Sequence, residues 1–103
     1  MVTNSSSTGY IIFNKTQETK PLVEFVKEVK HLIGVFNQEY SSHTTLQEVL
    51  QSCKGDTREF YPGETYTSFG DEESTAVGRV FDYALREGGE TKNFKWWQQD
   101  SLR

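Results

Sequence analysis

A stripe of apolar residues at helical spacing runs from Leu22 to Tyr40, and it constrains the fold more than any other feature of the chain. Counted from Leu22, the apolar residues recur at intervals of three, four, seven, ten, eleven, fourteen and eighteen. This spacing predicts one long amphipathic helix that begins at Pro21, with Thr19 or Lys20 as its cap. Residues on the opposite face are expected to be solvated: Glu24, Lys27, Glu28, Lys30 and His31.

Two shorter apolar patterns predict further helices. Residues 44–47, Thr-Thr-Leu-Gln, have the hydroxyl and amide spacing of a capping box that opens a second helix. Asp71 is expected to cap a third helix, with Glu72 and Glu73 close to the positive end of its dipole. The apolar face of this third helix has six members: Ala76, Val77, Val80, Phe81, Ala84 and Leu85.

Two segments have the composition of strands. Residues 9–14 form an apolar run that predicts a buried first strand with both faces covered. Residues 94–97, Phe-Lys-Trp-Trp, predict a closing strand that could pair with the first. Between residues 56 and 70 the helical period is lost, and Pro62-Gly63 suits the centre of a type II turn. This region is therefore either a small hairpin or an ordered loop.

Together the patterns predict an α+β fold in the order β-α-α-(β-hairpin)-α-β. Three helices are expected to pack on one face of a small antiparallel or mixed sheet. The chain has 103 residues, of which 34% are hydrophobic, and this supports one small core. We expect a single domain over residues 1–103, with residues 1–8 and 98–103 frayed.

The overall charge excludes some classes of partner. The chain has eleven basic and fifteen acidic residues. The resulting net charge of −4 argues against nucleic acid and against an anionic membrane surface as binding partners. No apolar run approaches the roughly 20 residues that span a bilayer. The first residues lack the basic and apolar regions of a signal peptide, and Cys53 is the single cysteine. We therefore expect a protein of a reducing, cytoplasmic compartment, or of the host cytoplasm if it is viral.

Catalytic groups are few in this chain. Cys53 and His43 stand near opposite ends of the second predicted helix, roughly 15 Å apart at about 1.5 Å per residue, so they cannot form a nucleophilic pair. His31 lies on the solvated face of the first predicted helix. We interpret Cys53 as a small buried apolar residue and both histidines as surface residues. No metal-ligand spacing is present, so we assign no catalytic residue, no metal site and no cofactor.

The acidic charge is concentrated in one segment. Residues 1–55 are neutral, whereas residues 56–73 hold six acidic side chains against Arg58 alone, a net charge of −5. The same segment is rich in aromatic residues, and this mixture is typical of a surface that docks on a basic protein. The alternative is that the rings cover the core beneath a solvated acidic loop. The predicted contact residues are Glu59, Phe60, Tyr61, Glu64, Tyr66, Phe69, Glu72 and Glu73.

Two adjacent tryptophans, Trp96 and Trp97, lie on the predicted closing strand. Neighbouring residues of a strand point to opposite faces, so one indole is expected in the core and the other at the surface or on a partner. Either tryptophan is a candidate for self-association, and a homodimer is possible.

The opening residues Asn4-Ser5-Ser6-Ser7-Thr8-Gly9-Tyr10-Ile11-Ile12 resemble the N-termini of small bacteriophage-encoded accessory proteins of unassigned function. The resemblance implies a source and carries no site residues. The leading hypothesis is a small non-enzymatic protein-binding module, a phage accessory factor that modulates a host protein through the acidic aromatic surface. The alternatives are a small enzyme or ligand-binding domain, with a pocket between the first helix and the sheet, and a structural homodimer.

Overall fold

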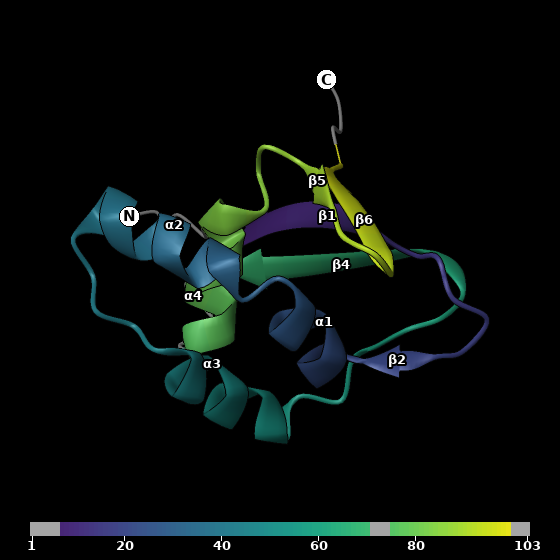
Figure 1. The fold of residues 1–103 in the computed structure, drawn as a ribbon, viewed down its shortest axis with the longest axis horizontal. Coiled ribbons are helices and arrows are strands. Elements are labelled where there is room, and N and C mark those ends of the chain that lie inside the picture. Colours follow the sequence, from purple (N-terminus) through teal and green to yellow (C-terminus); the bar gives the residue numbers. More distant parts are fainter. Residues whose placement is uncertain (1–6, 71–74, 100–103) are drawn as a thin grey trace, which may run out of the picture.

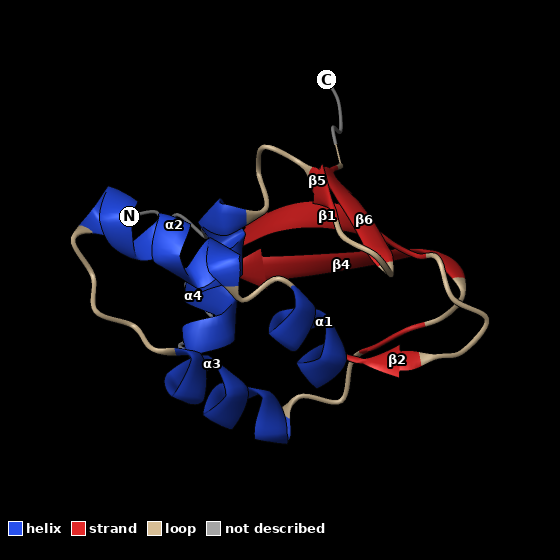
Figure 2. Ribbon diagram, viewed as in Figure 1, coloured by secondary structure: helices blue, strands red, loops and turns tan. Residues whose placement is uncertain are grey.

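The computed structural model describes residues 7–70 and 75–99, which form an α+β fold. Helices gather on one side of a four-stranded antiparallel sheet (Figures 1 and 2), as the sequence predicted. The strand order is β4-β1-β6-β5, with β1 (Ser7–Asn14), β4 (Gly63–Gly70), β5 (Gly89–Glu90) and β6 (Phe94–Gln98). Among the described residues no helix is long and apolar enough to cross a bilayer.

The helical side consists of short elements that connect these strands. They are α1 (Leu22–Glu28), α2 (His31–Tyr40), α3 (Leu46–Ser52) and α4 (Ala76–Ala84), with a 3₁₀ turn at Cys53–Gly55 after α3. A second, two-stranded sheet joins β2 (Lys20–Pro21) to β3 (Glu59–Phe60). The described ranges thus contain four α-helices rather than the three expected.

The extra helix arises because the long apolar stripe bends after α1. Val29 leaves helical geometry at φ −107° and ψ 25°, and α2 begins two residues later. The turn at residues 29–30 keeps nearly helical spacing. The apolar residues of α1 and α2 therefore recur at the same intervals, and the sequence pattern shows no break. The bend lets Leu22 and Phe25 pack within the main core, while Phe36 on α2 turns toward α4. α1 begins at Leu22 with Pro21 as its cap, one residue later than expected.

Two other helix starts also differ from expectation. Thr45, not Thr44, caps α3: its hydroxyl accepts from the Glu48 amide, and the Glu48 carboxylate accepts from the Thr45 amide. The described start of α4 has Thr75 as its cap, with the side chain accepting from the Gly78 amide. The predicted cap Asp71 lies outside the described residues.

The centre of the sheet is β1, which pairs with β4 on one side and β6 on the other. The predicted pairing of the first and closing strands is therefore confirmed. Tyr10 and Ile12 point into the core and are fully buried. Ile11 and Phe13 point to the other face and are only half-buried. The expectation that both faces of the first strand are covered was wrong, because the helices occupy one side only.

An aromatic cluster between the sheet and α1 forms the middle of the core. The Phe25 ring makes edge contacts with four other rings at centroid distances of 5.1 to 6.0 Å: Phe60, Phe81, Phe94 and Trp96. The five rings come from four elements, α1, β3, α4 and β6, so the Phe25 side chain ties the helical layer to the sheet.

Residues 56–70 do not form the hairpin considered from the sequence. β3 pairs with β2, whereas β4 continues for eight residues along β1, so the two strands joined by Tyr61 and Pro62 belong to different sheets. Gly63 has φ +95°, which agrees with the glycine position of a type II turn. The chain therefore turns a corner at Pro62-Gly63 and enters the main sheet as its edge strand.

Candidate protein-binding surface

The face of the sheet opposite the helices carries apolar side chains in register across three strands. Tyr66 on β4, Ile11 on β1 and Trp97 on β6 are direct cross-strand neighbours. Tyr66 is 61% exposed, and the other two are half-buried. Cross-strand neighbours lie within side-chain contact distance, so these three residues form one continuous row.

A second row lies beside the first. It runs from Glu64 on β4 through Phe13 on β1 to Lys95 on β6, and then to Glu90 on β5. The half-buried Phe13 ring extends the apolar area, and the charged residues flank it. We name the two rows together the open sheet face: Ile11, Phe13, Glu64, Tyr66, Glu90, Lys95 and Trp97.

Tyr66 lies flat on this face because Gly9 leaves room for its ring. A Cβ atom added to Gly9 would lie 2.5 Å from the Tyr66 hydroxyl oxygen and 2.8 Å from a ring carbon. The tyrosine therefore covers the backbone of the neighbouring strand and presents its other ring face outward.

The charge on the two sides of the open sheet face is unequal. At the β5 and β6 side, Lys15 forms an ion pair with Glu90. At the β4 side, Glu64 is exposed on β4 and Glu59 is exposed on β3, which precedes β4 in the chain, and no ion pair joins either to another described residue. The β4 side is therefore acidic, whereas the β5 and β6 side, with Lys15 and Lys95 against Glu90, has a small excess of positive charge.

Arg58, the one base of the acidic segment, is turned inward. Its guanidinium binds the Asp56 carboxylate at 3.0 Å, donates to the Ser68 carbonyl at 2.8 Å, and lies 4.4 Å from the centre of the Phe69 ring. Asp56 is thereby neutralised. The outward charge of the described part of this segment comes from Glu59 and Glu64.

The structure divides the predicted contact residues into three groups. Tyr61, Tyr66, Glu59 and Glu64 are exposed, as a contact role requires. Phe60 and Phe69 are fully buried, so the prediction that they anchor a partner was wrong. Both rings belong to the core, where they pack against Phe25 and Phe81 respectively. Glu72 and Glu73 lie outside the described residues.

The two tryptophans point to opposite faces, as alternation predicted. Trp96 is buried beneath Gly89, where an added Cβ would lie 2.5 Å from the indole ring. Trp96 is only 3% exposed, so its ring offers little surface for self-association. Trp97 remains available on the open sheet face. Ile11 and Phe13 were missed as residues of this face, because residues 10–13 are all apolar and no polar alternation marks which side is open.

The two histidines are exposed and Cys53 is buried, as expected. Among the described residues no three His, Cys, Asp or Glu side chains are grouped so that they could hold a metal ion. Burial, together with the nearby Asp56 carboxylate, raises the pKa of the Cys53 thiol to about 11.

Cys53 is accordingly expected to react slowly with thiol reagents in the native protein. Compared with the urea-unfolded chain at the same pH near 8, its rate with an aromatic disulfide should fall at least about a hundredfold, because both the thiolate fraction and access decrease. The reaction is followed by the absorbance of the released thiolate. Equal rates in the two states would contradict the buried placement.

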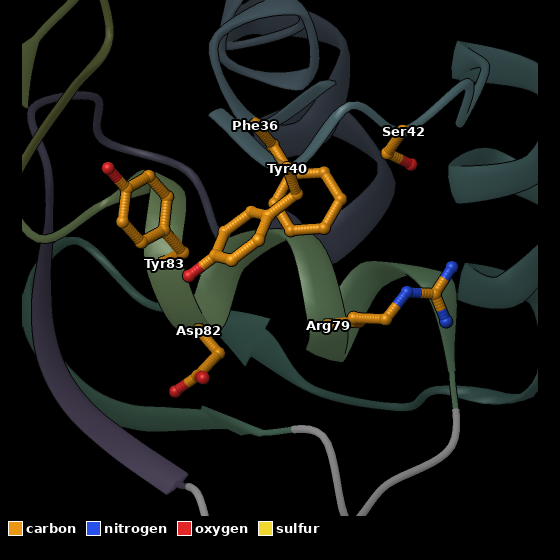
Figure 3. A pocket seen from close by; sticks show the side chains of 6 residues that line it. All are labelled: Phe36, Tyr40, Ser42, Arg79, Asp82 and Tyr83. Atoms are coloured by element: carbon orange, nitrogen blue, oxygen red, sulfur yellow. The ribbon is translucent and has the colours of Figure 1, made fainter. Parts of the chain in front are cut away.

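The aromatic cluster around Phe25 packs into the space between α1 and the sheet, where the sequence suggested a pocket. A cavity of about 310 Å³ lies instead between α2 and α4 (Figure 3).

Comparisons with protein-family models, with curated proteins and with solved structures found no match.

Proposed function

We propose that the protein is a non-enzymatic protein-binding module that docks through the open sheet face and its acidic β4 side. The observation that carries the proposal is the uncovered row of Tyr66, Ile11 and Trp97, which places two large aromatic residues at a surface. Aromatic anchors of this kind are enriched at the centre of protein interfaces. A phage accessory factor that modulates a host protein would need such a surface.

The charge distribution indicates what kind of partner fits. Glu64 on β4 and Glu59 on the preceding β3 form an acidic margin, and the net charge of the whole chain is −4. The proposed partner therefore has an apolar patch next to basic side chains. Long-range attraction between such charges acts mainly on the association rate.

The test uses two variants of the full chain and a matched control. The first variant reverses both margin charges, Glu59→Lys with Glu64→Lys, and the second removes the central ring, Tyr66→Ser. The control, Glu24→Lys with Glu87→Lys, makes the same change in charge on exposed residues of α1 and of the segment after α4. Partners captured from the native host by wild-type protein are identified by mass spectrometry, and their binding rates are measured by surface plasmon resonance.

The proposal expects the charge reversal to slow association at least about tenfold at low salt, while the control changes it much less. Tyr66→Ser should mainly speed dissociation, since it removes buried contact area. Association rates that respond equally to both charge pairs would contradict the acidic margin, and dissociation unaffected by Tyr66→Ser would contradict the face.

The homodimer is the competing use of the same surface, and Trp97 is the residue that favours it. Sedimentation of the wild-type protein and of Trp97→Ser distinguishes a homodimer from a monomer that binds a different protein through this face. A wild-type dimer that becomes monomeric in Trp97→Ser would assign the open sheet face to a second copy and overturn the proposal of a different partner.

A further inference from the structure

The cavity between α2 and α4 is separate from the open sheet face and has two chemically distinct ends. Figure 3 shows Tyr40, Tyr83 and Asp82 toward one end, with Arg79 extending below Ser42 toward the other. The Tyr40 ring centre lies 5.1 Å from that of Tyr83, in an edge arrangement, and 5.0 Å from that of Phe36 on the same helix. The cavity thus has an aromatic wall, and its volume of about 310 Å³ suits a small organic group.

Asp82 is already committed to neighbours within the fold. It is 8% exposed, and one carboxylate oxygen accepts from the Thr8 hydroxyl at 2.7 Å. The other oxygen lies 3.6 Å from the Arg86 guanidinium, which also donates to the Asp82 carbonyl at 2.9 Å. These contacts tie α4 to β1, and they leave Asp82 little capacity to bind a ligand cation.

Arg79 is in the opposite situation. Its side chain is exposed, and no hydrogen bond or ion pair joins its guanidinium to any residue within 7–70 or 75–99. Of the two charged residues among the six that line the cavity, Arg79 is therefore the one whose side chain has no partner within the described residues. A guanidinium presents parallel N–H donors that match the two oxygens of a carboxylate.

We infer that this cavity binds a carboxylate carried on an apolar or aromatic group. The carboxylate pairs with Arg79 near Ser42, and the apolar group lies against the Phe36 and Tyr40 rings. Two sources share this chemistry: a free small organic acid, and the C-terminal residue of a peptide.

Among the described residues, the end of the cavity opposite Arg79 offers no free cation for the ligand carboxylate. Burial raises the pKa of Tyr83, and the negative charges of Glu39 and Glu87 add to that effect. Asp82 lies at the same end, and the Arg86 guanidinium there, 5.7 Å from the centre of the Tyr83 ring, is already bound to Asp82. The charged group of the ligand therefore belongs at the Arg79 end.

The experiment is a titration of the ¹⁵N-labelled full chain, followed by amide chemical shifts. The probes are 3-phenylpropionate and its amide, which has the same ring but no charge. Saturable shifts at Arg79, Tyr40 and Tyr83 are expected with the acid at up to about 10 mM, a range suited to fragments of this size. The amide should bind at least about tenfold more weakly. Absence of saturable shifts with the acid, or equal binding of the amide, would overturn the inference.

Substitutions test whether the acid binds in this cavity, and a second ligand tests whether the natural ligand is a free acid or a peptide C-terminus. Arg79→Gln and Tyr40→Leu should each weaken binding of 3-phenylpropionate at least about fivefold, whereas Lys27→Gln, which removes an exposed charge on α1, should not. Unchanged affinity in Arg79→Gln would also overturn the inference. N-acetyl-alanyl-phenylalanine serves as the peptide probe: tighter binding than 3-phenylpropionate assigns the site to a peptide C-terminus, and weaker binding assigns it to a free acid.

Discussion

Replacing Phe25 by alanine is expected to lower the free energy of unfolding by about 3–5 kcal/mol. The ring is fully buried and contacts Phe60, Phe81, Phe94 and Trp96, so its removal leaves a cavity that four separate elements would have to close. Because domains of this size have a total stability of about 5–15 kcal/mol, the variant should be marginal or unfolded at 37 °C.

Urea denaturation followed by circular dichroism and by tryptophan fluorescence measures this loss. Trp96 lies 5.8 Å from the Phe25 ring and reports directly on the cluster. Phe25→Leu keeps most of the volume and should cost less than half as much. Val35→Ala provides the matched control, because Val35 is 48% exposed on α2 and its truncation should change stability by less than about 0.5 kcal/mol. If Phe25→Ala cost no more than this control, the cluster would not be the centre of the core.

The sequence predicted the elements better than it predicted their ends and partners. The helical stripe from Leu22 to Tyr40 was recognisable because apolar residues three and four positions apart lie on the same face of a helix. The break at Val29 was not, because the connecting turn preserves that spacing. Glu28 shows a related failure. Glu28 was expected in solvent, but its carboxylate accepts hydrogen bonds from the Thr91 hydroxyl and the Asn93 amide. These partners lie more than 60 residues away in the chain, so no local pattern could have predicted them.

The candidate surface was only half predictable for a different reason. Composition selected the acidic aromatic segment as a region but could not separate buried rings from exposed ones. Period-two alternation along β4 separates them, since Tyr66 points outward while Thr67 and Phe69 point into the core. That rule needed the knowledge that the segment is a strand, and Pro62-Gly63 favoured a short hairpin or loop instead. The cavity beside Arg79 depends on how α2 packs on α4, and no local pattern encodes that packing.

Asn14→Ala is expected to be the most damaging loss of a polar side chain, at about 2–4 kcal/mol. Asn14 is 1% exposed at the end of β1. Its amide nitrogen donates to the carbonyl oxygens of Glu18 and Phe60, both at 2.8 Å, and its oxygen accepts from the Thr16 amide and hydroxyl. One side chain thus joins β1, the following turn and β3. Alanine would leave the buried Phe60 carbonyl without this donor.

Asn37→Ala is the matched control, because the Asn37 side chain also bonds in both directions, to the carbonyl and amide of Thr44, but it is only half-buried. Loss of the Asn37 side chain should cost about 1 kcal/mol, since water can replace part of the pairing.

Asn14→Asp tests whether the side chain at position 14 must donate hydrogen bonds to the two carbonyl oxygens. The new carboxyl group faces two carbonyl oxygens in a buried site, so its pKa in the folded state should rise above the ordinary value of about 4. Its neutral form can donate to one carbonyl, so the variant should be most stable below that ordinary pKa and lose stability as pH rises through the raised one. Urea denaturation of Asn14→Asp at several pH values, with wild-type protein as reference, measures the difference. A relative stability that increased with pH would contradict the donor role of the Asn14 amide.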